Sequence, residues 1–171
     1  NSTGAFTYTI SDAAVATISG ATLTAVGIGT ATITTTQAES ANYNAGSVST
    51  TLTVAKATPT IGSMAAINKT FGDANFALTI PTSNSTGLFT FASSNTAVAA
   101  ITNNTVTIVG AGTITITATQ ATSANYLAGS VTTTLTVAKA NPTIGIQQNI
   151  TRGYGSAAIT LVAPGSNSTG A

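Results

Sequence analysis

The stretch TITITATQATSANYLAGSVTTTLTV, residues 113–137, decides the fold of this chain. Apolar and polar residues alternate near both of its ends, most clearly over 113–119 and over 131–137. A period of two residues is typical of a β-strand with one buried face and one solvent-exposed face. We therefore predict two strands, and in the first of them Ile114 and Ile116 face a core while the threonines line the solvent side.

The same stretch belongs to a long internal repeat. The string NSTG occurs at 1–4, 84–87 and 167–170, so that its copies lie 83 residues apart. Aligned without a gap, residues 1–83 and 84–166 are identical at 49 of 83 positions. A solenoid coil repeats every 20–50 residues or so, whereas a period of 83 residues fits one small β-domain per repeat.

A short joint separates successive repeats. The tripeptide Ala-Lys-Ala, at 55–57 and again at 138–140, follows an alternating strand and comes shortly before Pro59 or Pro142. Proline fixes its own φ and restricts the preceding residue to extended conformations, so the joint should be stiff. We predict three parts: the C-terminal part of one repeat (1–56), a complete repeat (57–139) and the N-terminal part of the next repeat (140–171).

The complete repeat consists of short β-branched runs separated by Gly, Asn and Ser turns, and no segment has helical periodicity. This pattern predicts an all-β fold of tandem immunoglobulin-like antiparallel β-sandwiches with about seven strands in each 83-residue repeat. The predicted strands lie at 59–62, 67–71, 75–80, 88–92, 97–101, 104–109, 113–119 and 130–137, the first two sharing one split edge strand. The predicted core consists of Ile101, Val109, Ile114, Ile116, Leu135 and Val137.

Two groups of residues, in the complete repeat and at the joint that follows it, carry a family resemblance. The first group is Ser94-Asn95, Ala97-Val98-Ala99, Ile101, Val106, Val109-Gly110 and Gly112 to Ile116; the second is Asn125-Tyr126, Ala128-Gly129, Leu135-Thr136-Val137, Lys139-Ala140 and Pro142. The first resembles bacterial Ig-like domains of group 2. The second resembles the tandem repeats of giant cell-surface adhesins and filaments of the Bacteroidetes type. The resemblance covers the whole chain and implies seven-stranded sandwiches strung in long arrays at the bacterial cell surface.

Charge is unusually scarce, because only 4% of the residues are charged against about 25% in ordinary globular proteins. A net charge of +1 without a basic cluster argues against nucleic-acid binding. No apolar run reaches the 18 or so residues of a membrane span. The high β-branched content favours packed strands over disorder, and the uncharged Thr-, Ser- and Asn-rich surface indicates an extracellular location.

Residues for catalysis are missing from the sequence. There is no His or Cys, and general acid–base chemistry needs a group whose pKa is tuned near the working pH. None of the three acids is repeated at the equivalent position 83 residues later: Asp12, Glu39 and Asp73 align with Asn95, Thr122 and Ser156. A site lost between neighbouring repeats cannot be the purpose of the repeat. We predict that the chain is not an enzyme and has no catalytic, cofactor-binding or metal-binding residues.

The joints carry Lys56 and Lys139, which bears on two kinds of site. Calcium prefers six to eight oxygen ligands, several of them carboxylates, so calcium dependence is not expected. An intramolecular Lys–Asn cross-link needs a neighbouring acid, and none is shared by both repeats. We therefore interpret the two lysines as solvated linker residues.

Two recurring motifs admit a binding or a structural interpretation. Tyr43 and Tyr126 recur in Ser-Ala-Asn-Tyr and could stack on glycans, but such a tyrosine more often closes the end of a sandwich core. In NSTG, we expect Asn84 to cap a turn and Gly87 to supply a positive φ. Both motifs are interpreted as structural.

The leading functional prediction is a structural stalk or spacer repeat of a long extracellular adhesin or cell-surface filament, without a cofactor. Its partners would be neighbouring repeats of the same chain and, in a filament, other copies. One alternative is a module that binds glycans or a host protein through its loops, which carry function in many sandwiches. Another is a self-assembling fibre subunit, since low charge removes the repulsion between domains.

The order of the predicted parts leaves two arrangements open. The sequence is either a window on a longer chain of similar repeats, or 140–166 completes residues 1–56 of the next molecule head to tail, as in donor-strand exchange. An uncovered sandwich would expose its core and an unpaired edge. We therefore do not expect 1–171 to be a compact monomer with three well-folded parts.

Overall fold

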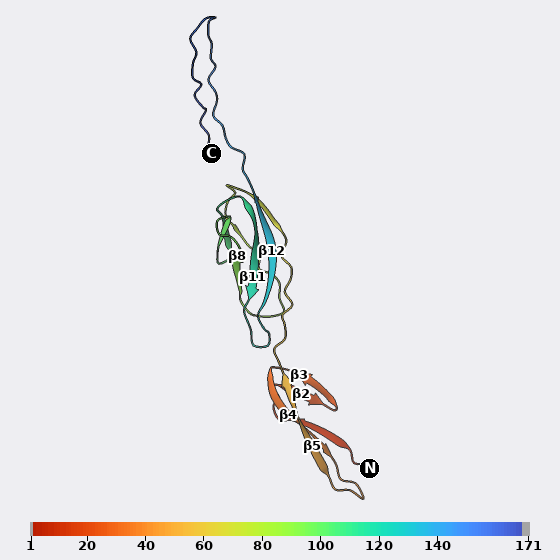
Figure 1. Cartoon of the computed structure of the whole chain (residues 1–171). Coiled ribbons are helices and arrows are strands. Elements are labelled where there is room, and N and C mark those ends of the chain that lie inside the picture. The colour runs from red at the N-terminus through yellow and green to blue at the C-terminus, as the bar shows by residue number, and fades with distance from the viewer. Residues whose placement is uncertain (1, 169–171) are drawn as a thin grey trace.

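The computed structural model describes residues 2–168, so Asn1 of the first NSTG string and residues 169–171 lie outside the described residues. It contains twelve β-strands, and none of the described residues lies in a helix. The described chain thus offers no helical segment with the length and apolarity to cross a membrane. Figure 1 shows three parts in line: an N-terminal unit (residues 2–55), a central unit (57–138) and a C-terminal hairpin (140–168).

Seven strands form the central unit: β6 (Ile67–Thr70), β7 (Phe76–Ala77), β8 (Phe89–Ser93), β9 (Ala99–Thr102), β10 (Thr105–Ile108), β11 (Gly112–Gln120) and β12 (Gly129–Ala138). One sheet has the order β6-β12-β11-β8 and the other β7-β10-β9. The longest pairing joins β11 to β12 with Gly112 opposite Val137 and Gln120 opposite Gly129. The predicted all-β, immunoglobulin-like sandwich is confirmed.

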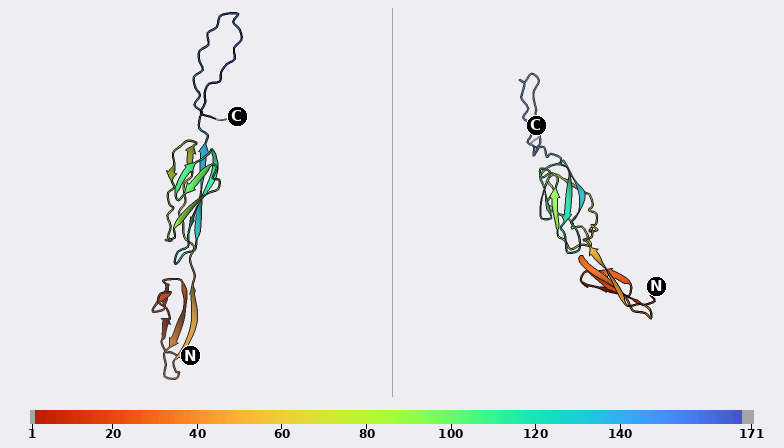
Figure 2. Two further views of the ribbon diagram at one scale, coloured as in Figure 1. Left: turned by 90° about the vertical axis from the view of Figure 1, so that its left-hand side faces the viewer. Right: turned by 60° about the horizontal axis from the view of Figure 1, so that its bottom comes forward.

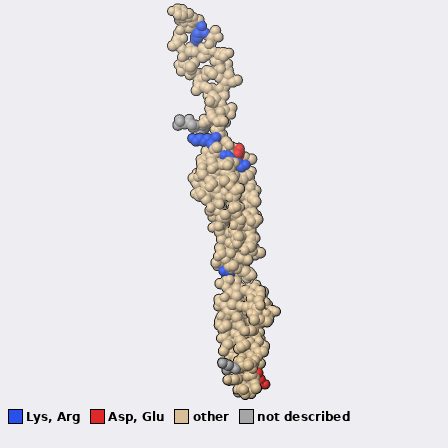
Figure 3. Space-filling view, turned by 90° about the vertical axis from the view of Figure 1, so that its right-hand side faces the viewer, with Lys and Arg blue, Asp and Glu red and all other residues tan. Residues whose placement is uncertain are grey.

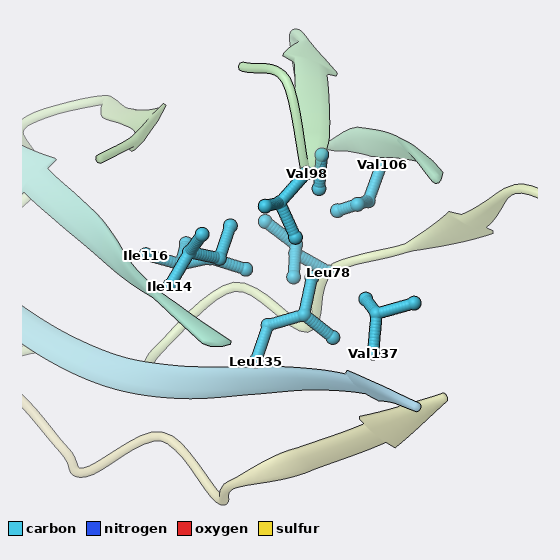
Figure 4. Close-up of a cluster of buried hydrophobic side chains, with 8 residues drawn as sticks. Leu78, Val98, Val106, Ile114, Ile116, Leu135 and Val137 are labelled. Carbon is cyan, nitrogen blue, oxygen red and sulfur yellow. The ribbon is translucent and has the colours of Figure 1, made fainter. Parts of the chain in front are cut away.

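Side chains from the two sheets meet in one apolar core (Figure 4). Ile116 of β11 and Leu135 of the adjacent strand β12 lie on the inner face of one sheet and are both 0% exposed. Val106 of the other sheet is also 0% exposed. The alternation in β11 and β12 places every second residue in this core, as the sequence predicts. The core cluster consists of Leu78, Val98, Ala99, Val106, Ile114, Ile116, Leu135 and Val137, with Ile67, Phe76, Phe91, Ile101 and Ile108 packed against it.

The prediction that Val109 is a core residue is wrong, because its side chain is 49% exposed. Strand β10 places Val106 and Ile108 toward the core and ends at Ile108, so Val109 is out of phase with the buried face. Its backbone N–H donates to the carbonyl oxygen of Val98 instead, at 2.9 Å. The apolar side chain of Val98, rather than that of Val109, fills this part of the core.

The predicted strand at 59–62 is reduced to an isolated bridge between Ile61 and Ser83. Pro59 has no N–H to donate, and the bridge holds two backbone hydrogen bonds, from Gly62 N–H to the carbonyl oxygen of Thr82 at 2.8 Å and from Asn84 N–H to that of Thr60 at 3.4 Å. The chain then crosses to β6, which pairs in parallel with the free edge of β12. The expected antiparallel sandwich therefore contains one parallel pair, formed by this crossing segment.

The N-terminal unit repeats the central strands in the same register. Its strands are β1 (Phe6–Ile10), β2 (Ala16–Ser19), β3 (Thr22–Ala25), β4 (Gly29–Gln37) and β5 (Gly46–Val54), in sheets ordered β1-β4-β5 and β2-β3. The pairing of β4 with β5 again sets a glycine opposite a valine at one end and a glutamine opposite a glycine at the other. In this unit β5 is an edge strand, whereas β12 has β6 beside it.

A glutamine fastens the NSTG loop to the sheet in both units; it is buried in the central unit and half-buried in the N-terminal unit. Gln120 is 1% exposed, and its Nε2 donates to the carbonyl oxygens of Ser85 and Gly87 at 2.9 Å each. Its Oε1 accepts a hydrogen bond from the Ser83 hydroxyl at 2.7 Å. Gln37 makes the equivalent bonds to Ser2 and Gly4 at 3.3 and 3.1 Å. The side-chain amide thus supplies the hydrogen-bond donor that a neighbouring strand would otherwise give to these loop carbonyls.

The predicted roles of two NSTG residues need correction. Gly87 is not among the residues with positive φ; a Cβ atom there would collide with the backbone carbonyl of Ala121, so the loop needs glycine for close approach. Asn84 does not cap its own loop, because its Oδ1 accepts the N–H of Thr60 at 2.8 Å. We therefore attribute the recurrence of NSTG to two contacts: Gly87 packs closely against the backbone of Ala121, and Asn84 accepts a hydrogen bond from Thr60.

Replacing Ile116 with Ala should lower the free energy of unfolding of the central unit by about 2–4 kcal/mol, because a fully buried side chain leaves a cavity. The measurement is native-state hydrogen exchange of the β11 and β12 amides in the full chain. Val109→Ala serves as the control and should change the value by about 0.5 kcal/mol or less. Equal effects of the two substitutions would contradict the inward and outward assignments.

Replacing Gln120 with Leu should lower the free energy of unfolding of the central unit by about 2–4 kcal/mol, because the carbonyl oxygens of Ser85 and Gly87 lose their donor. Gln37→Leu is the matched control, since Gln37 is only half-buried and water can replace its bonds. Gln37→Leu should lower the free energy of unfolding of the N-terminal unit by about 1 kcal/mol or less. Hydrogen exchange of β8 and of β1 measures the two effects separately, and a larger loss in the N-terminal unit would contradict this account.

Candidate functional site: the joint between the units

The few charged side chains of the chain do not gather into a reactive cluster. Within residues 2–168, no group of three His, Cys, Asp or Glu side chains is arranged to hold a metal ion. Asp12 Oδ1 accepts the N–H of Ala14 at 2.8 Å, and Asn95 Oδ1 accepts that of Ala97 at 3.0 Å. The carboxylate and the amide oxygen perform the same turn-capping role, which explains why the charge is not repeated.

The remaining charged groups of the central unit also have local structural contacts. Asp73 closes the turn after β6, where its Oδ2 accepts the N–H of Thr70 at 2.9 Å. Lys69 Nζ lies 4.8 Å from the centroid of the Phe76 ring, within the range of a cation–π contact. In the face shown in Figure 3, the blue and red charged residues lie near the ends of the units, and the flank of the central unit is tan, without charged residues.

At the joint between the N-terminal and central units, three hydrogen bonds fix the linker residue Lys56 and the first residue of the central unit, Ala57, against the β11–β12 loop. Lys56 Nζ donates to the carbonyl oxygen of Ser123 at 2.7 Å. The N–H of Ala57 donates to the carbonyl oxygen of Asn125 at 2.9 Å, and the N–H of Leu127 donates to that of Ala57 at 2.8 Å. A linker that we expected to be solvated is therefore bonded to the β11–β12 loop of the unit that follows.

A tight turn presents the acceptors of the joint. The N–H of Ser123 donates to the carbonyl oxygen of Tyr126 at 3.0 Å, and Tyr126 forms a parallel bridge with Ala57. Because this turn closes on itself, its outward carbonyls are free to accept bonds from the linker. The recurring tyrosine thus lies at a contact between units, which refines its interpretation as the closing residue of a core.

The same turn exists at the far end of the N-terminal unit. The N–H of Ser40 donates to the carbonyl oxygen of Tyr43 at 2.9 Å, and the N–H of Tyr43 donates back at 3.2 Å. Tyr43 is 52% exposed, whereas its equivalent Tyr126 is half-buried at the joint. Lys139 is the equivalent of Lys56 and is exposed. The chain therefore has one formed joint and both halves of a second.

Sequence reasoning identified the joint lysines but missed their acceptors. Ser123 and Asn125 take part through backbone carbonyl oxygens, and a carbonyl carries no sequence signal. The available signal was positional: the Ser-Ala-Asn-Tyr string recurs with the joint at a constant spacing. The structure brings Lys56 and the tyrosine motif together, whereas the acids Asp12 and Asp73 are each confined to their own turns.

Comparisons with known proteins give the following likenesses. No protein-family model matches the chain, and no curated protein matches it. The structure of domains 4–9 of the surface layer protein SbsC is similar at 20% identity and a TM-score of 0.36, covering 84% of this chain and 24% of that one. Human protocadherin-24 EC1-2 is similar at 12% identity and a TM-score of 0.32, covering 79% of this chain and 82% of that one. The chain thus spans about a quarter of the surface layer fragment, and these likenesses assign it no activity.

Calcium should leave the stability of the chain unchanged. Neither the joint nor the turns bring together the several carboxylates that a calcium site requires. Thermal unfolding of the full chain with millimolar calcium and then with excess chelator should give midpoints within about 1 °C of each other. A shift of about 10 °C would reveal a site built from backbone and amide oxygens.

Proposed function

We propose that this chain is a spacer segment of a long extracellular bacterial protein, either an adhesin or a cell-surface filament. Each sandwich adds length, and the joint keeps neighbouring sandwiches in line. The chain performs no catalysis and needs no cofactor in this role. The observation that supports the proposal best is the joint itself, in which Lys56 and Ala57 are bonded to the loop of the following unit.

The joint is suited to limiting the bending between units. A free tripeptide linker would allow many relative orientations, whereas three bonds and a parallel bridge at Ala57 fix the linker against the following unit. Strands of about ten residues at about 3.3 Å per residue give each unit a length of roughly 33 Å. Two joined units would then span roughly 70 Å, and length per residue is the useful property of a spacer.

The surface of the units also fits a spacer outside the cell. Threonines line the outer faces of β11 and β12, and almost no charged side chain interrupts them. Such a surface has few groups to titrate or to be screened, so its properties change little with salt or pH. This composition supports an extracellular location, where both vary.

The stiffness of the joint can be measured by the distance between two spin labels, because the chain has no cysteine of its own. Labels at Thr51→Cys and Thr132→Cys report one distance across the joint, and dilution with unlabelled protein removes distances between molecules. We expect one narrow distance distribution. Inserting Gly-Ser-Gly-Ser between Lys56 and Ala57 should broaden it at least about twofold, as expected for a flexible linker.

The matched control carries the same insertion between Gly20 and Ala21, in the exposed turn that joins β2 to β3. This variant should keep the narrow distribution. A broad distribution in the unmodified chain would contradict the spacer proposal, because the joint would then be flexible. Saturable binding of a glycan on an array, lost on Tyr126→Ala, would favour a ligand-binding module instead.

A further inference from the structure

The chain enters and leaves the central unit through two strands that lie side by side. The first strand of the unit is β6 and the last is β12, and these two are direct neighbours in one sheet. They pair in parallel, with Ile67 opposite Leu135 and Thr70 opposite Ala138. Because both strands run in the same direction, the start of β6 and the end of β12 lie at opposite ends of the pair.

An extended segment leads into β6 along the same line. Ala57 forms a parallel bridge with Tyr126 in the loop before β12. Further on, the Thr133 hydroxyl donates to the carbonyl oxygen of Ala65 at 2.8 Å. This pair is 68 positions apart in the sequence, as are the partners in the ladder of β6 and β12, so the segment keeps the register of the strand that follows it.

The contacts continue to the last residue of β12. The N–H of Phe71 donates to the carbonyl oxygen of Ala138 at 2.8 Å. Residues 57–71 therefore run beside residues 126–138 in one line of parallel contacts, which we call the parallel seam.

The parallel seam is packed against the rest of the sandwich. Ile67 packs against the apolar core, and Lys69 Nζ lies 4.8 Å from the ring centroid of Phe76 in the other sheet. Gly129 permits a close approach, because a Cβ atom there would lie 2.8 Å from Pro59 Cγ. The segment that leads into the unit is thus held along its length.

Tension on the central unit loads the parallel seam in shear. In Figures 1 and 2 the central unit lies between the N-terminal unit and the C-terminal hairpin, so the chain enters it at one end and leaves it at the opposite end. Pulling on the two neighbours therefore draws Ala57 and Ala138 apart along the direction of the strands. Ladder hydrogen bonds run from strand to strand, so this motion strains all of them together.

The other strands of the unit do not carry this load directly. Strands β7 to β11 lie between β6 and β12 in the sequence, whereas the sheet order brings β6 and β12 together. While the parallel seam holds, tension passes from residues 57–71 into β12 without crossing the core.

We propose that the parallel seam is the load-bearing contact of the central unit and keeps its sandwich folded when the chain is under tension. This inference rests on the proposed spacer role, in which both neighbours pull on the unit. A single hydrogen bond contributes little, so the resistance comes from several bonds that share the load. Forced unfolding depends on the rate of unfolding, so the direction of pulling matters even though the equilibrium stability is the same.

Pulling single molecules of the full chain in two directions tests the proposal. The chain has no cysteine of its own, so handles can be attached to introduced cysteines at exposed positions. Ala55→Cys with Ala140→Cys loads the parallel seam in shear. Ala74→Cys with Ala140→Cys pulls on the turn after β6, beside the end of β12, and opens the same seam from one end.

At equal loading rates, we expect shear to require at least about twice the force of opening from one end, because several bonds must break together. The shear event should lengthen the chain by roughly 250 Å, which is the extended length of residues 55–140 at 3.3–3.6 Å per residue less the folded span. Equal forces in the two directions would overturn the proposal.

Two matched threonine variants locate the resistance. Thr133→Val removes the hydroxyl that donates to Ala65, whereas Thr117→Val changes β11 opposite Thr132, away from residues 57–71. Thr133→Val should lower the shear force by about 10–30%, and Thr117→Val should leave it unchanged. Hydrogen exchange of the β8 amides verifies that both variants are folded. Equal effects of the two substitutions would place the resistance outside the parallel seam and overturn the proposal.

The forces and the spin-label distances test different parts of the chain, because the distances report the joint. A narrow distance distribution with equal forces in both directions would retain the spacer role and overturn the load-bearing seam. A broad distribution with direction-dependent forces would support the seam and contradict the spacer role.

Discussion

An apolar stripe along the inner face of β11 and β12 has to be covered before the sandwich can be stable, because alternating strands expose one hydrophobic face until a second layer packs on it. The chain contains this strand pair twice. In β4 and β5 the register is the same, yet Leu52 is only half-buried, whereas Leu135 is 0% exposed. The register is thus a local property of the strands, whereas burial depends on the segment at 57–83.

The same dependence explains how much could be predicted from the sequence. Period-two alternation identified β11 and β12 and the inward direction of Ile116, because both follow from the pleat of one strand. Val109 was assigned to the core although the alternation Thr105-Val106-Thr107-Ile108 places Val106 and Ile108 inward, and β10 ends at Ile108, which leaves Val109 exposed. The parallel pairing of β6 and the anchoring by Gln120 depend on contacts between residues 33 or more positions apart, which is why no local sequence pattern predicted them.

The joint could be located from the sequence but not described. Ala-Lys-Ala and the following proline indicate a short, extended connection, and the structure has one. Its bonds, however, run from Lys56 and Ala57 to carbonyl oxygens of Ser123 and Asn125. Every residue has such an oxygen, so only the tight turn at Tyr126 determines which carbonyls point outward. A site made of backbone acceptors is visible only in three dimensions.

Differences between the two repeats show which properties the fold requires. Gly20 and Asn103 occupy the same turn with φ values of 59° and 56°, a left-handed conformation that glycine and asparagine tolerate best. Asp12 and Asn95 differ in charge, yet each accepts the N–H two residues further on. In both cases the residue changes while the backbone geometry or the acceptor oxygen is retained. A chain that preserves backbone geometry and acceptor oxygens while its charges vary has its constraints in the joining and covering of sheets, as the proposed spacer role requires.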